Sequence, residues 1–91
     1  MEIIMLTMTD HVTLWLEQDR PVRLYWREQR WRVTDTPTPI YADADDVPPM
    51  ITHPGKVQAG WRFQATSEAG ESFVLDALRD GSGWAVVHAY S

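Results

Sequence analysis

A run of arginines interleaved with aromatic residues, RPVRLYWREQRWRV over residues 20–33, is the first feature of the sequence that could do chemistry. If these residues form strands, alternation puts Arg23, Tyr25 and Arg27 on one face, with Arg32 of the next strand across from them. Guanidinium groups bind carboxylates and phosphates, and aromatic rings stack on bases or anchor protein contacts. The run therefore predicts an interaction surface.

Two classes of partner fit this surface. We favour a protein, or self-association with the aspartate-rich segment around residue 45, because Arg, Trp and Tyr are enriched at protein interfaces and Trp15 and Tyr25 fall opposite the expected core. Single-stranded nucleic acid is the alternative, through stacking and phosphate contacts. The net charge of −5 opposes a polyanion.

Neither partner is required by the pattern. The same residues also fit a solvated sheet face whose arginines pair with Glu17, Glu28 or Asp76. Trp15 and Tyr25 also fit a sheet that is covered on both sides.

The histidines and acids give no comparable signal for catalysis. The three histidines lack the short spacing of metal ligands: His11, His53 and His88. His53 with Asp43, Asp45 and Asp46 resembles neither a calcium loop nor a zinc site. His88 has no acid partner near it in sequence, and no serine lies in a G-x-S-x-G turn. We therefore expect no enzyme activity, no metal, no cofactor and no small-molecule substrate.

The elements that must carry these residues are predicted to be strands, because apolar residues alternate with polar ones along most of the chain. The expected apolar faces are Val12, Leu14 and Leu16; Val22, Leu24 and Trp26; Trp31 and Val33; and Trp61, Phe63 and Ala65. Turn signals at 19–21, 28–30, 68–71 and 80–83 separate these segments, as in hairpins.

The last strands point to a closed sheet. Residues 73–75 form a continuous apolar run, and both faces of residues 84–90 carry apolar side chains. We predict an all-β fold: a small antiparallel barrel or strongly curved sheet of five or six strands. Residues 3–6 are expected to add a strand. Residues 10–18 could form a short helix with Asp10 as its N-cap, but Val12, Thr13 and Trp15 favour a strand.

Residues 35–56 differ in kind. The segment contains prolines at positions 37, 39, 48, 49 and 54. Because proline donates no backbone hydrogen bond, we expect no regular pairing of this segment with a neighbouring strand. We expect a long proline-rich loop, which Ile40, Tyr41, Met50 and Ile51 could pin across an open sheet edge.

Length and composition suit one domain over residues 1–91, with strand blocks at about 1–34 and 57–90. The chain contains no cysteine, which favours the cytoplasm and excludes disulfide and thiolate chemistry. The start of the chain lacks the basic region of a signal peptide, and no stretch approaches the about 20 apolar residues that span a bilayer. We expect no membrane partner.

Two blocks, RPVRLYWREQRWRV and WRFQATSEAGESFVLDALRDGSGWAVVHAY, resemble an uncharacterised family of small actinobacterial β-domains. Members of that family occur alone and as the C-terminal appendage of the Y-family-polymerase-like subunit of the mutagenic DNA-repair machinery. The likeness covers residues 12–34 and 61–90. It implies a non-catalytic accessory module linked to DNA-damage tolerance. The chain departs from the family pattern at residues 27–30, where a glycine is expected in the turn, and in the linker, where prolines and acids replace tryptophans.

Overall fold

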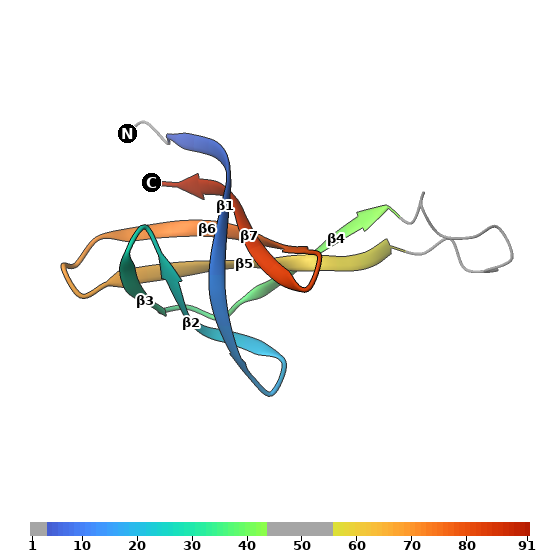
Figure 1. Ribbon diagram of the computed structural model, residues 1–91, viewed down its shortest axis with the longest axis horizontal. Coiled ribbons are helices and arrows are strands. Elements are labelled where there is room, and N and C mark those ends of the chain that lie inside the picture. The colour runs from blue at the N-terminus through green and yellow to red at the C-terminus, as the bar shows by residue number, and fades with distance from the viewer. Residues whose placement is uncertain (1–3, 44–55) are drawn as a thin grey trace, which may run out of the picture.

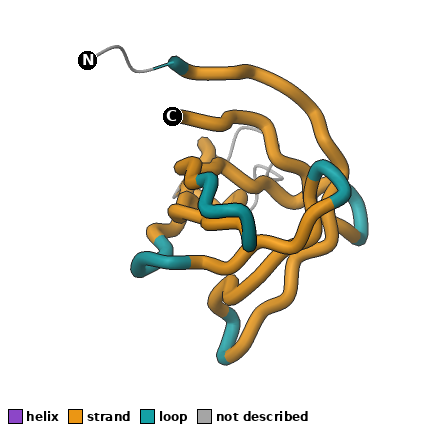
Figure 2. Tube along the Cα trace, turned by 90° about the vertical axis from the view of Figure 1, so that its left-hand side faces the viewer, coloured by secondary structure: helices purple, strands orange, loops and turns teal. Residues whose placement is uncertain are grey.

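The computed structural model describes residues 4–43 and 56–91, and all of its regular structure is β-strand (Figure 2). The strands are β1 (Met5–Glu17), β2 (Arg20–Trp26), β3 (Gln29–Val33), β4 (Thr38–Asp43), β5 (Lys56–Ser67), β6 (Ser72–Asp80) and β7 (Gly83–Tyr90).

Six of the strands close into an antiparallel barrel. The sheet order is β3-β2-β1-β7-β6-β5-β4, and a further pairing of β3 with β5 closes the ring. Strand β5 has 12 residues and pairs with β6 along one side. On its other side its end pairs with β3, and its first half pairs with β4. Figure 1 shows β4 and the start of β5 extending together away from the barrel. The predicted all-β small barrel is confirmed.

Tight hairpin turns set the register of the first three strands. Gln18 and Asp19 join β1 to β2, and Arg27 and Glu28 join β2 to β3. All four residues have positive φ, from 51° to 63°, although none is glycine. Two-residue hairpins favour this left-handed conformation because it matches the twist of the strands. The turn at 27–28 therefore forms without the glycine that the family likeness leads one to expect.

The core holds an aromatic cluster at one end of the barrel. The ring centroids of Trp26 and Trp31 lie 5.1 Å apart, and each lies 5.8 Å from Phe73. The Trp31 Nε1 donates to the backbone oxygen of Trp26, and the Trp26 Nε1 donates to Asp10. These bonds satisfy the polar atoms of two tryptophans that are at most 2% exposed. Leu24, Phe63, Leu75 and Val86 continue the core.

The strand that was favoured over the helix for residues 10–18 is confirmed. The extra strand expected near the N-terminus is not separate: within the described residues, Met5 and Leu6 belong to the same continuous strand, β1. The length of β1 lets it pair with two strands in succession: with β7 through Met5–Val12 and with β2 through Thr13–Glu17.

The expected loop over residues 35–56 was wrong for residues 38–43, which form β4. Pro39 is compatible with this strand because β4 is an edge strand that pairs only with β5, so one of its sides needs no ladder hydrogen bonds. Ile40 and Tyr41 lie on this strand, as the proposed pinning of a sheet edge required. Met50 and Ile51 lie outside the described residues.

Candidate interaction face

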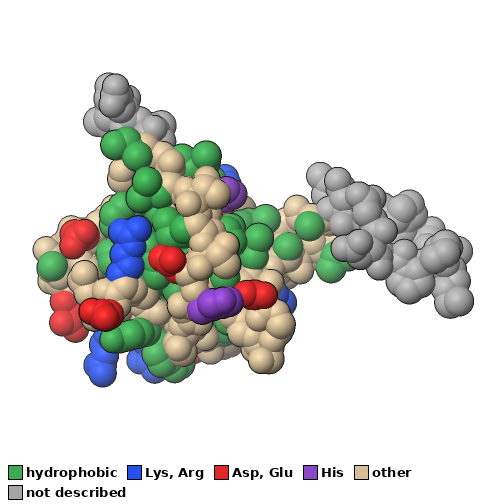
Figure 3. Space-filling model, turned by 45° about the horizontal axis from the view of Figure 1, so that its top comes forward, with side chains coloured by type: hydrophobic (Ala, Val, Ile, Leu, Met, Phe, Trp, Pro, Cys, Tyr) green, Lys and Arg blue, Asp and Glu red, His purple; other side chains and the backbone are tan. Residues whose placement is uncertain are grey.

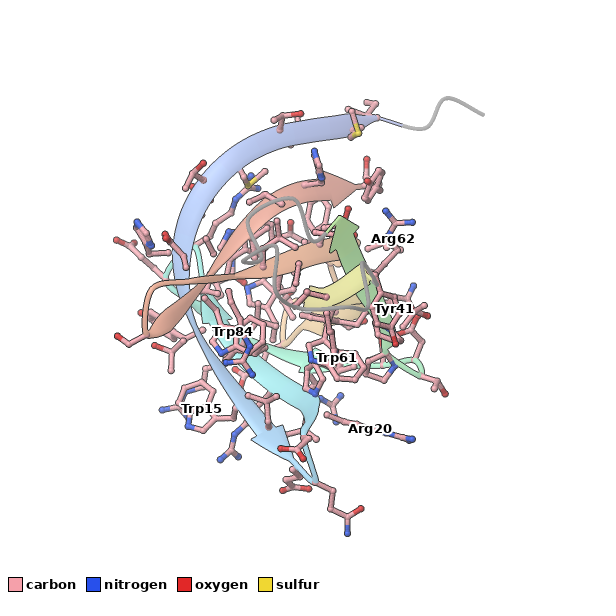
Figure 4. All side chains as sticks on the ribbon, turned by 90° about the vertical axis from the view of Figure 1, so that its right-hand side faces the viewer. Trp15, Arg20, Tyr41, Trp61, Arg62 and Trp84 are labelled. Atoms are coloured by element: carbon pink, nitrogen blue, oxygen red, sulfur yellow. The ribbon has the colours of Figure 1, made fainter. Side chains whose placement is uncertain are left out.

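The arginine-rich run forms β2 and β3, and its exposed side chains lie beside Trp15 of β1 on the outer surface of the sheet. The register sets Trp15 of β1 opposite Arg23 of β2, and Arg23 opposite Arg32 of β3. In the neighbouring row, Tyr25 lies opposite Arg30. These five residues, Trp15, Arg23, Tyr25, Arg30 and Arg32, are exposed and form what we call the arginine face. Figure 4 shows Trp15 projecting outward from β1.

No guanidinium of the arginine face forms a salt bridge with a carboxylate among residues 4–43 and 56–91. The guanidinium carbon of Arg23 lies 5.3 Å from the ring centroid of Trp15, a cation–π contact. Trp15 is still 41% exposed and Tyr25 is 45% exposed. The face therefore offers guanidinium groups and aromatic surface, and the nearby Glu17 and Glu68 form no salt bridge with it.

A shallow hollow borders the face on its β5 side. It has a volume of about 470 Å³ and is lined by Arg30, Arg32, Thr66, Ser67 and Glu68. Two guanidinium groups at one hollow could reach a carboxylate from two directions, a geometry suited to an acidic side chain.

Arg27 does not belong to this face, so the alternation that grouped it with Arg23 and Tyr25 was wrong at this position. The chain enters the left-handed turn at Arg27, with φ of 54°, and alternation ends there. Its guanidinium carbon lies 4.3 Å from the ring centroid of Trp26 and 5.9 Å from that of Phe73. Arg27 thus covers the aromatic cluster. The alternation placed Arg32 on this face correctly. The same alternation puts Arg30, two residues earlier, on the same face, although Arg30 was not among the residues predicted from the sequence.

A second polar cluster lies on β5, β6 and β7. Asp76 is 4% exposed. Arg62 donates to both of its oxygens, at 2.7 and 3.0 Å. The Tyr90 hydroxyl donates to Oδ2 at 2.8 Å, and the Nδ1 of His88 lies 3.2 Å from the same oxygen. Figure 4 labels Arg62 at the outer surface.

The charges of this cluster support one another. Burial raises the pKa of Asp76, but the hydrogen bonds from Arg62, Tyr90 and His88 and the positive charge of Arg62 outweigh it, so the pKa lies below its usual value. The hydrogen bond to Asp76 raises the pKa of Arg62, and the same contact raises that of Tyr90. Both carboxylate oxygens are occupied, so the cluster fits a clamp that ties three strands together better than a general base.

Two interpretations from the sequence are corrected by this cluster. His88 does have an acid partner, Asp76, which is 12 residues away and is brought beside it by the pairing of β6 with β7. Asp76 pairs with Arg62 and not with the arginine face, and neither Glu17 nor Glu28 forms a salt bridge there.

No group of three potential metal ligands occurs among the residues that the structure describes. His53, Asp45 and Asp46 lie outside that part of the chain, and the third aspartate of the group, Asp43, is the last residue of β4.

No known protein family, curated protein or solved structure matches this chain. Over the described ranges, no helix is long and apolar enough to cross a membrane.

Proposed function

We propose that this chain is a non-catalytic binding module whose arginine face holds an acidic segment of a partner protein. The observation that carries the proposal is that Arg23, Arg30 and Arg32 converge on one sheet face without a described carboxylate partner. Arginines beside exposed tryptophan and tyrosine are the residue types that dominate binding energy at protein interfaces.

Charge favours a protein over single-stranded nucleic acid as the partner. The chain carries 13 acidic and 8 basic residues, so the field of the whole molecule repels a polyanion at long range. A stacking platform needs free ring faces, and one face of Trp15 already carries the guanidinium of Arg23. A short acidic peptide needs only the local charge of the arginine face. Single-stranded nucleic acid is kept as the second outcome of the test.

The wider setting is also part of the proposal. The absence of cysteine suits the cytoplasm, and the likeness to appended domains of the mutagenic repair machinery favours a partner in DNA-damage tolerance.

The test compares two labelled probes on the same protein: a peptide that alternates glutamate with leucine, and a single-stranded oligothymidine. Fluorescence anisotropy at two salt concentrations gives both affinities. The proposal expects the peptide to bind more tightly. Replacing both Arg23 and Arg32 with alanine should weaken peptide binding at least tenfold, with little change in melting temperature, since both side chains are exposed.

The matched control is Arg79→Ala, which removes one exposed arginine from β6 outside the arginine face. It should leave peptide affinity within about twofold of the wild type. Equal loss of binding in the control would mean that only net charge matters. Tighter binding of the oligonucleotide, with a steep loss at higher salt, would favour the nucleic-acid alternative.

A further inference from the structure

The first half of β1 has a free edge. Met5–Val12 pairs with β7 on one side, and pairing with β2 on the other side begins only at Thr13. No strand in the described part of the chain pairs with the outer side of these first residues. Figure 2 shows this segment running beside the C-terminal strand at the outside of the molecule.

The hydrogen-bonding pattern shows which backbone groups face the free edge. Ile4 and Ser91 exchange two backbone hydrogen bonds, at 3.3 and 3.0 Å. Alternation in an antiparallel pair then points the backbone N–H and C=O of Leu6 toward β7, and those of Met5 and Thr7 away from it. Met5 and Thr7 therefore present donors and acceptors to a further strand.

The side chains of residues 4–9 at this edge are uncharged, and all of them except Thr7 and Thr9 are apolar. Ile4 is 53% exposed, Met5 54% and Leu6 41%, and residues 4–9 contain neither a charge nor a proline. Figure 3 shows hydrophobic side chains at the end of the molecule where the N-terminal trace leaves it. Proteins normally protect a sheet edge with charges, prolines or bulges. The edge strand β4 has such protection, with Pro39 and an irregularity after Ile40. In the first half of β1 the pairing with β7 is irregular only between Thr7 and Asp10, so the protection begins after Thr7 and leaves residues 4–7 with a regular, uncharged edge.

We propose that this edge pairs with the same edge of a second copy of the chain, in antiparallel orientation about a two-fold axis at Leu6. In this register Met5 exchanges backbone hydrogen bonds with the partner's Thr7, and Leu6 lies across from the partner's Leu6. Ile4 then lies beside the partner's Met8, so that apolar side chains meet at Leu6 and at the two Ile4–Met8 positions, while each Met5 faces the partner's Thr7, which is uncharged.

Several features favour a second copy over a different protein. Antiparallel pairing about a two-fold axis needs a strand that is complementary to itself, and the uncharged segment meets that need without placing like charges opposite each other. The two copies also present the same backbone donors and acceptors, those of Met5 and Thr7, to each other. A single strand pair falls below the about 1,200 Å² of stable interfaces, so the dimer should be weak and dependent on concentration.

Cysteine substitution tests the register directly, because the chain contains no cysteine of its own. Residues across from each other in a non-hydrogen-bonded antiparallel pair have Cα atoms about 4.5 Å apart, within the range that a disulfide spans. Leu6→Cys should therefore form a covalent dimer under mild oxidation. Val57→Cys, at an apolar position on β5 that is more exposed than Leu6, should stay mostly monomeric. Equal cross-linking of both variants would overturn the proposal.

Proline substitution tests the backbone contact. Thr7→Pro removes an N–H that points to the free edge and takes no hydrogen bond from the pairing with β7. It should abolish the concentration-dependent dimer in analytical ultracentrifugation, while the melting temperature stays close to that of the wild type. Leu6→Pro is the matched control and should lower the melting temperature, because the Leu6 N–H bonds to β7.

The proposal is independent of the arginine face. The variant with both Arg23 and Arg32 replaced by alanine should dimerise like the wild type, and raised salt should not weaken the dimer. A wild-type protein that stays monomeric up to about 1 mM, the concentration at which even a 1 mM Kd would show dimer, would overturn the proposal. A dimer that Thr7→Pro leaves intact would also overturn it.

Discussion

Replacing Asp76 with alanine tests whether the polar cluster on β5, β6 and β7 clamps the barrel. Asp76 receives hydrogen bonds from Arg62, Tyr90 and His88. Hydrogen bonds to a charged group contribute about 1.5–3 kcal/mol each when buried. The Arg62 side chain is 52% exposed and regains water when its partner is lost, so its share is smaller.

We expect a total loss of about 3 kcal/mol in the free energy of unfolding. For a domain of this size that loss lowers the melting temperature by about 12–24 °C. Urea denaturation followed by tryptophan fluorescence measures the change. Asp80→Ala on the same strand is the control and should cost under about 1 kcal/mol, because Asp80 is 49% exposed and contacts only the exposed His11. A loss below 1 kcal/mol for Asp76→Ala would refute the clamp.

The same residue makes a prediction about pH. The pKa of Asp76 is lower in the folded chain than its ordinary value. Its contribution is therefore fully present above the unfolded pKa of about 3.9 and is lost as the pH falls through the folded pKa. The stability difference between the wild type and Asp76→Asn should be constant from pH 5 to 7 and shrink below pH 4. A difference that stays unchanged at pH 2 would contradict this account.

Two further substitutions test the backbone of the fold. A Cβ at Gly60 would lie 2.0 Å from the backbone oxygen of Ala77, so Gly60→Ala should lower the free energy of unfolding by about 3 kcal/mol or more. A Cβ at Gly83 would have its nearest contact at 3.9 Å, so Gly83→Ala should change the free energy of unfolding little. Thermal unfolding of the two variants tests this difference. Glu28 has a φ of 60°, so Glu28→Gly should raise the free energy of unfolding by about 1 kcal/mol in urea. Ser82→Gly, in a turn where only Gly81 has positive φ, should lower it, and a gain in both variants would refute the argument from strain.

Much of the barrel was predictable because its strands bury one face each. Leu14, Leu24 and Trp31 are buried, and Trp15, Arg23 and Arg32 are exposed, as period-two alternation requires. The hairpin turns also lay close to the predicted positions, since short loops between apolar segments leave few other arrangements.

The prediction failed where neighbours along the sheet decide the conformation. Residues 38–43 contain proline and read as loop, yet they form a strand because the first half of β5 offers an unpaired edge to them. Arg27 does not lie on the arginine face, because the chain enters the hairpin turn at that residue. Neither event has a signal in local composition.

The sequence by itself determined the all-β class, the buried faces of the strands and the shared face of Trp15, Arg23, Tyr25 and Arg32, because side-chain alternation is a local property of extended chain. That this face is uncovered, with Trp15 41% and Tyr25 45% exposed, was decided by the tertiary structure. Only the tertiary structure decided which residues meet across strands. It closed the barrel through β3 and β5, joined Asp76 to Arg62 and His88, and left the first half of β1 with a free edge. These contacts depend on strand order and register, which are set by the packing of the whole sheet.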